Sequence, residues 1–101
     1  MAAADGNEIR VIAQAFARSE SVATVRTVLK NMVAPTRAEK GCITYDLHEV
    51  LGDPCQFVFF EIWESETVLE AHTHTPHYQD LERAQSLLTE PLKITKLRRL
   101  L

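Results

Sequence analysis

The sequence predicts an α+β sandwich of the ferredoxin-like class, an antiparallel sheet with its helices on one face. Three observations support this prediction. The chain has 101 residues, 46% hydrophobic and 25% charged, which fits one globular domain. Its apolar spacing changes in the order strand, helix, strand, strand, helix pair, strand. The first and third strands carry apolar residues on both faces, which indicates a second cover for the sheet.

The first strand is predicted over residues 8 to 18, because apolar side chains alternate there. Ile12 and Phe16 lie on the face opposite to Ile9 and its alternates. Residues 1 to 7 are expected to form a frayed tail, since they have neither the basic start nor the apolar core of a signal peptide. The domain is therefore expected to span residues 8 to 101.

A helix follows, for which Ser19 or Ser21 is a suitable cap. Pro35 is expected to kink or break this helix, because proline removes a hydrogen bond and clashes with the preceding turn. A last turn is expected to reach Glu39, and Gly41 suits a left-handed stop. The apolar stripe of this helix consists of Val22, Val25, Leu29, Met32 and Val33.

Two strands, residues 42 to 51 and 56 to 64, are predicted to form a hairpin around the turn residues 52 to 54. A slip of one residue would exchange the faces of either strand. Folding the hairpin about this turn gives two expected neighbours, Tyr45 with Glu61 and Ile43 with Trp63.

Ser65 is predicted to cap a short helix that ends near Thr73, and the Thr-Pro pair at 75 and 76 begins a second one that extends to Leu88. Residues 91 to 100 are expected to close the sheet as its last strand. Since helices cover only one face, we expect a homodimer in which two open sheet faces meet.

Composition excludes several partners. The formal net charge is −3 and the basic residues are scattered, so no nucleic-acid surface is predicted. No apolar run has the roughly 20 residues of a membrane-spanning helix. Cys42 and Cys55 lie near opposite ends of the predicted hairpin, too far apart to bridge. Two free thiols are typical of a reducing compartment, which predicts a cytoplasmic protein.

The chemistry is concentrated in residues 57 to 78, which hold the only Trp and three of the four His. His72 follows Val68 and Leu69 by four and three residues, so it is expected to point inward, as a core-edge histidine or a catalytic one. His74 is expected to face water. His77 begins a helix, where the dipole favours an anion; the alternative is a partly buried flank.

Glu61 alternates with Phe59 and Trp63, so a carboxylate is expected among aromatic rings. Such a group is either a base, an orienting partner of a histidine, or a structural residue bonded to Tyr45 or to a cation. Trp63, Tyr45 and Tyr78 are typical of packing, and their flat rings also suit an aromatic ligand.

No metal or cofactor is predicted. His72, His74 and His77 lie within six residues, but a proline interrupts their spacing and no second ligand cluster accompanies them. The sequence has no glycine-rich phosphate loop, no Gly-x-Ser-x-Gly and no Cys-x-x-Cys, so nucleotide and flavin sites lack a signal.

The sequence resembles the antibiotic biosynthesis monooxygenase (ABM) family, which includes quinol monooxygenases. The resemblance covers almost the whole chain. It rests on Pro-Thr-Arg-Ala-Glu-Lys-Gly-Cys at 35 to 42, the Glu-x-Trp at 61 to 63, and His-x-x-Thr-Pro-His-Tyr at 72 to 78.

The resemblance implies a dimeric α+β barrel that oxidises a small phenolic or quinol-type aromatic with O2, without flavin, haem or metal. His72 and His77 would then transfer protons or stabilise an oxyanion. Glu61 would orient or activate them, and Trp63, Tyr45 and Tyr78 would line the substrate pocket.

Two alternatives remain at this level. The His-x-x-Thr-Pro-His-Tyr segment also resembles the isomerase of phosphorylated autoinducer-2, a proton-transfer enzyme on the same fold. A non-catalytic ligand-binding dimer is the other, because fold alone does not define function. Haem degradation is disfavoured, because Ala15 and His72 occupy the places of the Asn and Trp that haem-degrading relatives use.

Overall fold

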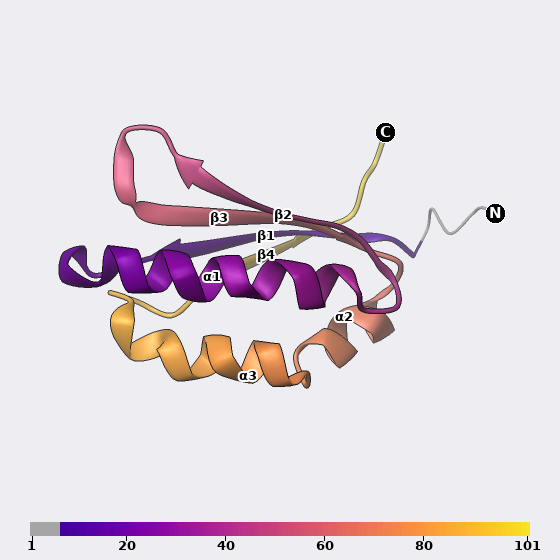
Figure 1. The fold of residues 1–101 in the computed structure, drawn as a ribbon. Helices are drawn as coiled ribbons and strands as arrows, with labels where there is room; N and C mark the ends of the chain where they lie inside the picture. Colours follow the sequence, from indigo (N-terminus) through magenta and orange to yellow (C-terminus); the bar gives the residue numbers. More distant parts are fainter. Residues whose placement is uncertain (1–6) are drawn as a thin grey trace.

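The computed structural model of the protein describes residues 7–101 and confirms the ferredoxin-like α+β class. Four strands form one antiparallel sheet in the order β2-β3-β1-β4, and the helices lie on one side of it (Figure 1). The elements are β1 Ile9–Phe16, α1 Val22–Arg37, β2 Cys42–Val50, β3 Asp53–Trp63, α2 Glu66–His72, α3 Pro76–Arg83 and β4 Lys93–Leu97.

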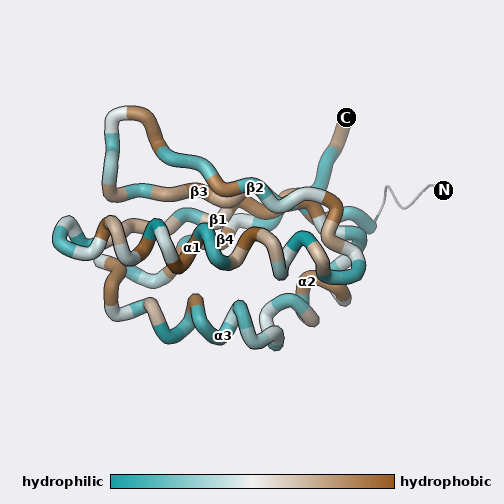
Figure 2. Tube along the Cα trace, in the orientation of Figure 1, coloured by the Kyte–Doolittle hydropathy of each residue, from teal (hydrophilic) through white to brown (hydrophobic). Residues whose placement is uncertain are grey.

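The predicted tail, residues 1 to 7, lies outside the described residues except for the exposed Asn7. Along β1 the two faces differ as expected. The face toward the helices is buried, while Ile12 and Phe16 on the other face are half-buried. The same alternation along β3 leaves Val58 and Phe60 half-buried on that open face. Figure 2 shows that hydrophobic residues alternate with hydrophilic ones along the strands as well as along the helices.

The hairpin is tighter than predicted. Its turn is Leu51–Gly52 rather than residues 52 to 54, and β3 begins at Asp53. Gly52 has a φ of +88°, which glycine adopts without a steric cost. Pro54 is tolerated in β3 because the pairing of β3 with β1 ends at the Phe16–Gln56 pair. No residue of β1 lies opposite Pro54, so the missing N–H of the proline breaks no hydrogen bond to β1.

The register confirms Tyr45 opposite Glu61. Ile43 is not the partner of Trp63, however, because an irregularity between Cys42 and Thr44 gives that position to Cys42. Ile43 is 48% exposed as a result. Strand bulges of this kind insert one unpaired residue, which alternation of side chains does not reveal.

Helix α1 does not break at Pro35 but continues to Arg37. The proline lies in the last turn, where it removes one hydrogen bond, and Ala38 N–H still reaches Ala34 O at 3.2 Å. The 3-10 helix Ser19–Ser21 precedes α1, and neither terminal serine provides a side-chain cap to α1. Gly41 has the left-handed backbone expected of it, with a φ of +88°, but it does not end the helix. The helix ends at Arg37 with Ala38 as its C-cap, so the predicted last turn to Glu39 is not helical.

The two short helices begin as predicted. The Ser65 side chain accepts from Val68 N–H, and the Thr75 side chain accepts from Tyr78 N–H at 3.2 Å, ahead of Pro76. The second helix is shorter than expected, since α3 ends at Arg83 and a 3-10 helix, Ala84–Leu87, follows.

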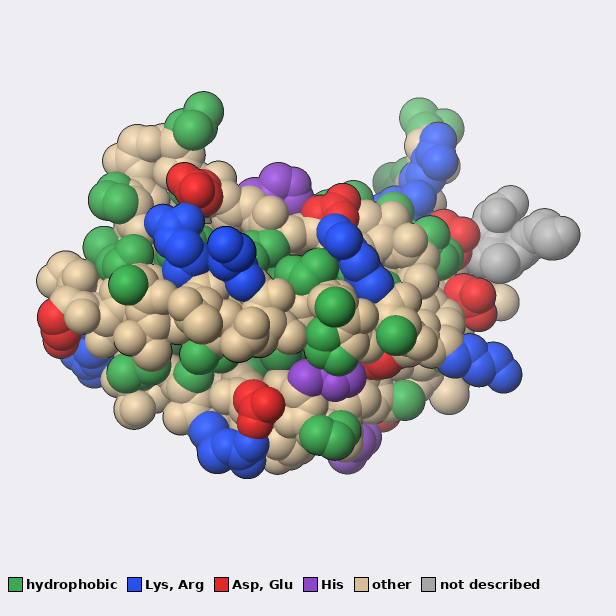
Figure 3. All heavy atoms as spheres, viewed as in Figure 1, with side chains coloured by type: hydrophobic (Ala, Val, Ile, Leu, Met, Phe, Trp, Pro, Cys, Tyr) green, Lys and Arg blue, Asp and Glu red, His purple; other side chains and the backbone are tan. Residues whose placement is uncertain are grey.

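The last strand is also shorter than the predicted 91 to 100. In Figure 3 hydrophobic side chains lie in the seam below α1, while basic side chains lie along the edge of α1 that faces the β2–β3 hairpin. Within residues 7–101, no helix combines the length and apolar character needed to cross a bilayer.

Candidate active site

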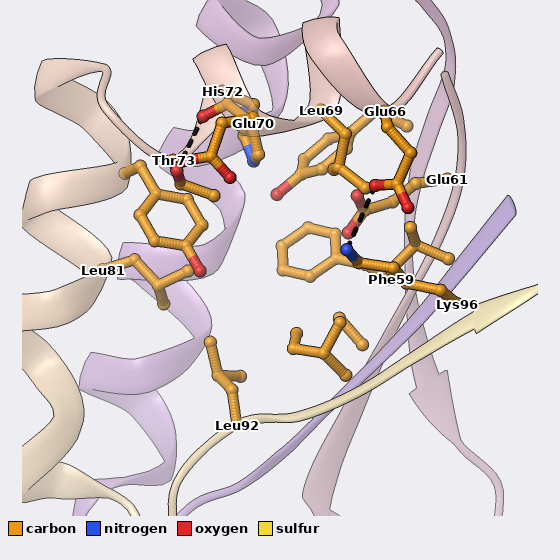
Figure 4. A pocket seen from close by; sticks show the side chains of 15 residues that line it. Phe59, Glu61, Glu66, Leu69, Glu70, His72, Thr73, Leu81, Leu92 and Lys96 are labelled. Carbon is orange, nitrogen blue, oxygen red and sulfur yellow. Dashed lines mark hydrogen bonds and ion pairs between the residues drawn. The ribbon is translucent and has the colours of Figure 1, made fainter. Parts of the chain in front are cut away.

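A cavity of about 190 Å³ lies between the sheet and the α2–α3 pair. Figure 4 shows His72, Leu81, Leu92 and Phe59 around the same central space. Apolar and aromatic side chains form most of its wall. The lining residues are Val11, Ala13, Tyr45, Phe59, Glu61, Glu66, Leu69, Glu70, His72, Thr73, Tyr78, Leu81, Leu92, Ile94 and Lys96.

His72 ends α2 and points inward, with 3% of its surface exposed. Three aromatic rings surround the imidazole. Its centroid lies 4.7 Å from that of Trp63, 5.1 Å from that of Tyr78 and 5.7 Å from that of Tyr45. Burial lowers the pKa of His72, although the hydrogen bond to Glu39 acts in the opposite direction. The predicted inward direction is therefore confirmed.

Glu39, just beyond α1, joins two histidines through one carboxylate oxygen. Its Oε2 lies 2.8 Å from Nδ1 of His72 and 2.5 Å from Nε2 of His77. All three side chains are shielded, with 13%, 4% and 18% of their surface exposed. A carboxylate on one ring nitrogen holds the imidazole in place and fixes which nitrogen remains for other partners.

The second ring nitrogen of His72, Nε2, has no hydrogen-bond partner among the described residues. His72 lines the cavity, whereas Glu39 does not. Since Nδ1 points to Glu39, Nε2 is the nitrogen available to a molecule in the cavity. A neutral imidazole in this arrangement can accept a proton from such a molecule.

Glu39, His72 and His77 also form the donor set of a cation site, with one ligand atom each within 4.8 Å of the others. Ligand atoms around a single first-row cation, at bonds of about 2.0–2.2 Å, lie roughly 3 Å or more apart. The 2.8 and 2.5 Å separations are those of hydrogen bonds. The observed geometry therefore suits shared protons better than a cation.

Glu61 is 5% exposed and lies on the same face of β3 as Trp63. The indole Nε1–H of Trp63 donates to its Oε1 at 2.8 Å, so neither expected partner, Tyr45 nor a cation, holds this carboxyl group. Burial raises the pKa of Glu61 to about 7, although the bond from Trp63 acts in the opposite direction. Glu61 is thus a carboxyl group that changes protonation near neutral pH.

Both tyrosines line the cavity. Tyr45 is 2% exposed and stacks on Phe59 with ring centroids 4.6 Å apart. Burial and the nearby Glu61 raise the pKa of the Tyr45 hydroxyl, and burial likewise raises the pKa of Tyr78. Both phenols are therefore neutral at physiological pH and can donate hydrogen bonds.

Of the six residues proposed from sequence, Tyr45, Glu61, His72 and Tyr78 line the cavity. Trp63 lies behind the wall, fully buried against His72, and His77 lies on the far side of Glu39. The remaining histidines lie elsewhere, as expected of His74, which pairs with Glu70 and has 72% of its side chain exposed.

Sequence reasoning missed Glu39 as a site residue. It lies 33 residues before His72, in the Pro-Thr-Arg-Ala-Glu-Lys-Gly-Cys segment, and only the fold brings the two together. Glu39 lies two residues before the left-handed Gly41, in a segment on which the family resemblance rests, and this position was the signal that could have identified it.

The mouth of the cavity lies between α2 and β4. Lys96 of β4 reaches Glu66 of α2 at 3.1 Å, and Figure 4 shows this ion pair at the edge of the cavity. Glu70 lines the same rim. With Glu61 inside, the wall carries three carboxyl groups and one lysine, which disfavours a strongly anionic ligand.

This combination defines a small-molecule site with acid–base groups on a ferredoxin-like scaffold. The model of the "Antibiotic biosynthesis monooxygenase" family matches residues 8–84, and the chain belongs to this family.

Similarity to individual proteins supports the family match. "Putative monooxygenase Rv0793" from Mycobacterium tuberculosis is 41% identical over 91 residues, covering 88% of both chains. Its solved structure superposes with a TM-score of 0.86 at 37% identity, covering 92% of this chain and 95% of that one. The crystal structure of PA3566 from Pseudomonas aeruginosa has a TM-score of 0.89 at 33% identity, covering 96% and 98% of the two chains.

Proposed function

We propose that this protein is a monooxygenase that oxidises a small phenolic or quinol-type aromatic with O2. The observation that carries the proposal is the His72 imidazole, fixed at Nδ1 by Glu39 and free at Nε2 beside an apolar cavity. The proposal is consistent with the ABM family match and with the monooxygenase names of relatives.

The size of the cavity supports an aromatic substrate of one substituted ring. A cavity of about 150 Å³ lined by apolar side chains holds benzene, and the cavity here measures about 190 Å³. Phe59 and Leu81 supply apolar contact, while Tyr45, Tyr78 and Glu61 offer polar groups to orient hydroxyls.

The chemistry follows from the groups in the wall. His72 Nε2 removes a phenolic proton, and the resulting phenolate gives one electron to O2. The two radicals combine to form a carbon–oxygen bond, and the peroxide receives a proton. Loss of the ring C–H proton then breaks the O–O bond, leaving one oxygen as a carbonyl and the other as water. The substrate supplies all four electrons that reduce O2 to a carbonyl oxygen and water, and the apolar cavity keeps water from the radical pair.

The assembly proposed for this chemistry is a homodimer through the open sheet face. Ile12, Phe16, Val58, Phe60 and Ile62 form an apolar strip there, and each is half-buried in the single chain. A strip of this kind on the central strands is typical of a protein interface. We propose the cytoplasm as its location, since Cys42 and Cys55 are free thiols.

The test compares aerobic and anaerobic incubation with single-ring hydroquinones and naphthohydroquinones, with O2 uptake and product mass as readouts. With ¹⁸O2 we expect one labelled oxygen in the product, and faster turnover of the single-ring compounds. Conversion without O2 would instead support the isomerase, and saturable binding without conversion would support the ligand-binding domain. The three carboxyl groups of the cavity wall argue against the phosphorylated isomerase substrate.

A further inference from the structure

Three groups form a continuous row that leads away from the cavity. His72 borders the cavity, and its side chain is 4% exposed. Glu39 and His77 do not border it, and their side chains are 13% and 18% exposed. The exposure of the side chains therefore increases along the row from the cavity outward.

The row needs no bridging water. The same oxygen, Oε2 of Glu39, is within hydrogen-bond distance of both imidazoles, at 2.8 and 2.5 Å. The two ring centroids are 6.0 Å apart. Other ionisable groups near His72 are Tyr45, Tyr78 and Glu61, all of which face the cavity side.

We propose that Glu39 and His77 form a reversible proton relay, which carries the proton taken by His72 out of the cavity and later returns it. This inference rests on the proposed function, since it assigns a path to the proton removed from the phenol. It gives Glu39 and His77 the role of relay residues rather than groups that touch the substrate.

Each proton has a defined position in the relay. When Nε2 of His72 takes the phenolic proton, the Nδ1 proton of that ring passes to Oε2 of Glu39. The proton that Oε2 already shares with Nε2 of His77 across 2.5 Å then moves fully onto that ring, whose own proton is on Nδ1. His77 then holds the positive charge or releases a proton to water.

The transfer has a chemical purpose. An imidazolium next to a phenolate stabilises the anion and hinders its loss of an electron to O2. Moving the charge to His77 leaves a neutral imidazole beside the phenolate. After the peroxide forms, Nε2 of His72 donates to it, and the reverse transfer through Glu39 restores the Nδ1 proton. The relay thus ends each cycle in its starting state.

The direct test measures proton exchange without substrate. In ¹⁵N NMR spectra, the exchange of the His72 Nδ1–H with water is compared in wild type, His77→Gln and Glu39→Gln. Glutamine can keep a hydrogen bond but cannot relay a proton. We expect exchange at least about tenfold slower in both variants, and wild-type exchange in the control His74→Gln, whose side chain is 72% exposed.

Unchanged exchange in a folded His77→Gln protein would overturn the relay. Stoichiometric Zn²⁺ binding by the wild type that His77→Gln abolishes would also overturn it, since a cation would displace both shared protons. In turnover, we expect His77→Gln to lower kcat and leave KM unchanged, with activity restored by added imidazole. Absence of turnover in the wild type would reject the proposed function, while the exchange measurement would still decide the relay.

Discussion

At the scale of single residues, the site depends on which nitrogen of His72 is free. Glu39 occupies Nδ1, and the aromatic rings of Trp63 and Tyr78 hold the imidazole in one orientation. Burial lowers the pKa of His72 and favours the neutral ring, although the contact with Glu39 acts in the opposite direction. A neutral imidazole with one free nitrogen is the form a general base requires.

Replacing His72 by alanine is expected to reduce turnover by a factor of about 100 or more, the usual contribution of a positioned base. The protein should still fold, because the apolar core that joins β1, α1 and β3 does not depend on this ring. Steady-state O2 uptake and far-UV circular dichroism measure the two effects. His74→Ala serves as the matched control, and activity in His72→Ala equal to that control would place the base elsewhere.

The raised pKa of Glu61 is expected to make the free energy of unfolding depend on pH. Its folded pKa is raised from 4.5 to about 7, so the folded state binds a proton that the unfolded state has lost. The contribution of protonated Glu61 to the stability of the folded state is fully present below pH 4.5 and is lost as the pH rises through 7. The difference amounts to about 3 kcal/mol.

The check is urea unfolding of wild type and Glu61→Gln between pH 5 and 8. Glutamine stays neutral, so the variant should gain stability relative to wild type as the pH rises. Taking the difference between the two proteins removes the opposite contribution of His72. A difference that stays constant over this range would mean that Glu61 titrates normally.

At the scale of elements, the junction between α1 and β2 sets the position of Glu39. Gly41 has a φ of +88°, and a Cβ added there would lie 2.7 Å from Cγ1 of Val68 in α2. The Gly41 carbonyl also accepts from Glu64 N–H at 2.9 Å. This close contact brings the loop with Glu39 against the helix that ends at His72.

Gly41→Ala is therefore expected to cost more stability than Gly52→Ala. Both glycines have a φ of +88°, but no atom lies within 4 Å of a Cβ at Gly52. Backbone strain alone costs about 1–2 kcal/mol, and the clash with Val68 adds to it at Gly41 only. Urea denaturation midpoints measure the difference, and equal losses would show that the Val68 contact can relax.

Local signals accounted for most of the element boundaries. The Ser65 cap and the Thr75–Pro76 start depend on neighbours within a few residues, and both were predictable. The bulge at Ile43 was not, because it depends on how β2 meets β3. Pro35 was misjudged because its effect depends on its distance from the helix end, which tertiary contacts determine.

In the site, too, the features set within one element were predictable and the contacts between elements were not. Alternation placed Glu61 with Trp63, and helical spacing turned His72 inward, since both rules act along one element. The Glu39–His72 contact joins residues 33 positions apart, and no periodicity reports such a pairing. The Trp63–Glu61 bond was not predictable from the shared strand face alone, because alternation does not determine the side-chain rotamers that bring the indole N–H to the carboxyl group.

At the scale of the whole molecule, the sheet separates two apolar regions, the cavity side under the helices and the open strip on the other face. Phe60 lies within this strip, paired with Ile12 of β1 and Asp46 of β2. If two copies of the chain placed these strips face to face, each strip would be covered by the other, which agrees with the proposed homodimer.

Phe60→Lys is expected to prevent the proposed dimer from forming, because two lysine charges would be buried in its interface without partners. Analytical ultracentrifugation measures the change. Thr27→Lys, on the exposed surface of α1, adds the same charge away from the strip and should leave the dimer intact. A wild-type monomer at high concentration, or a dimeric Phe60→Lys protein, would contradict the proposed interface.

The single tryptophan has a practical consequence. Trp63 is fully buried, donates to Glu61 and packs against His72. Its fluorescence therefore comes from one known position and is sensitive to the charge of both neighbours. Emission intensity should report, without any added label, when either neighbour changes its charge and when a ligand enters.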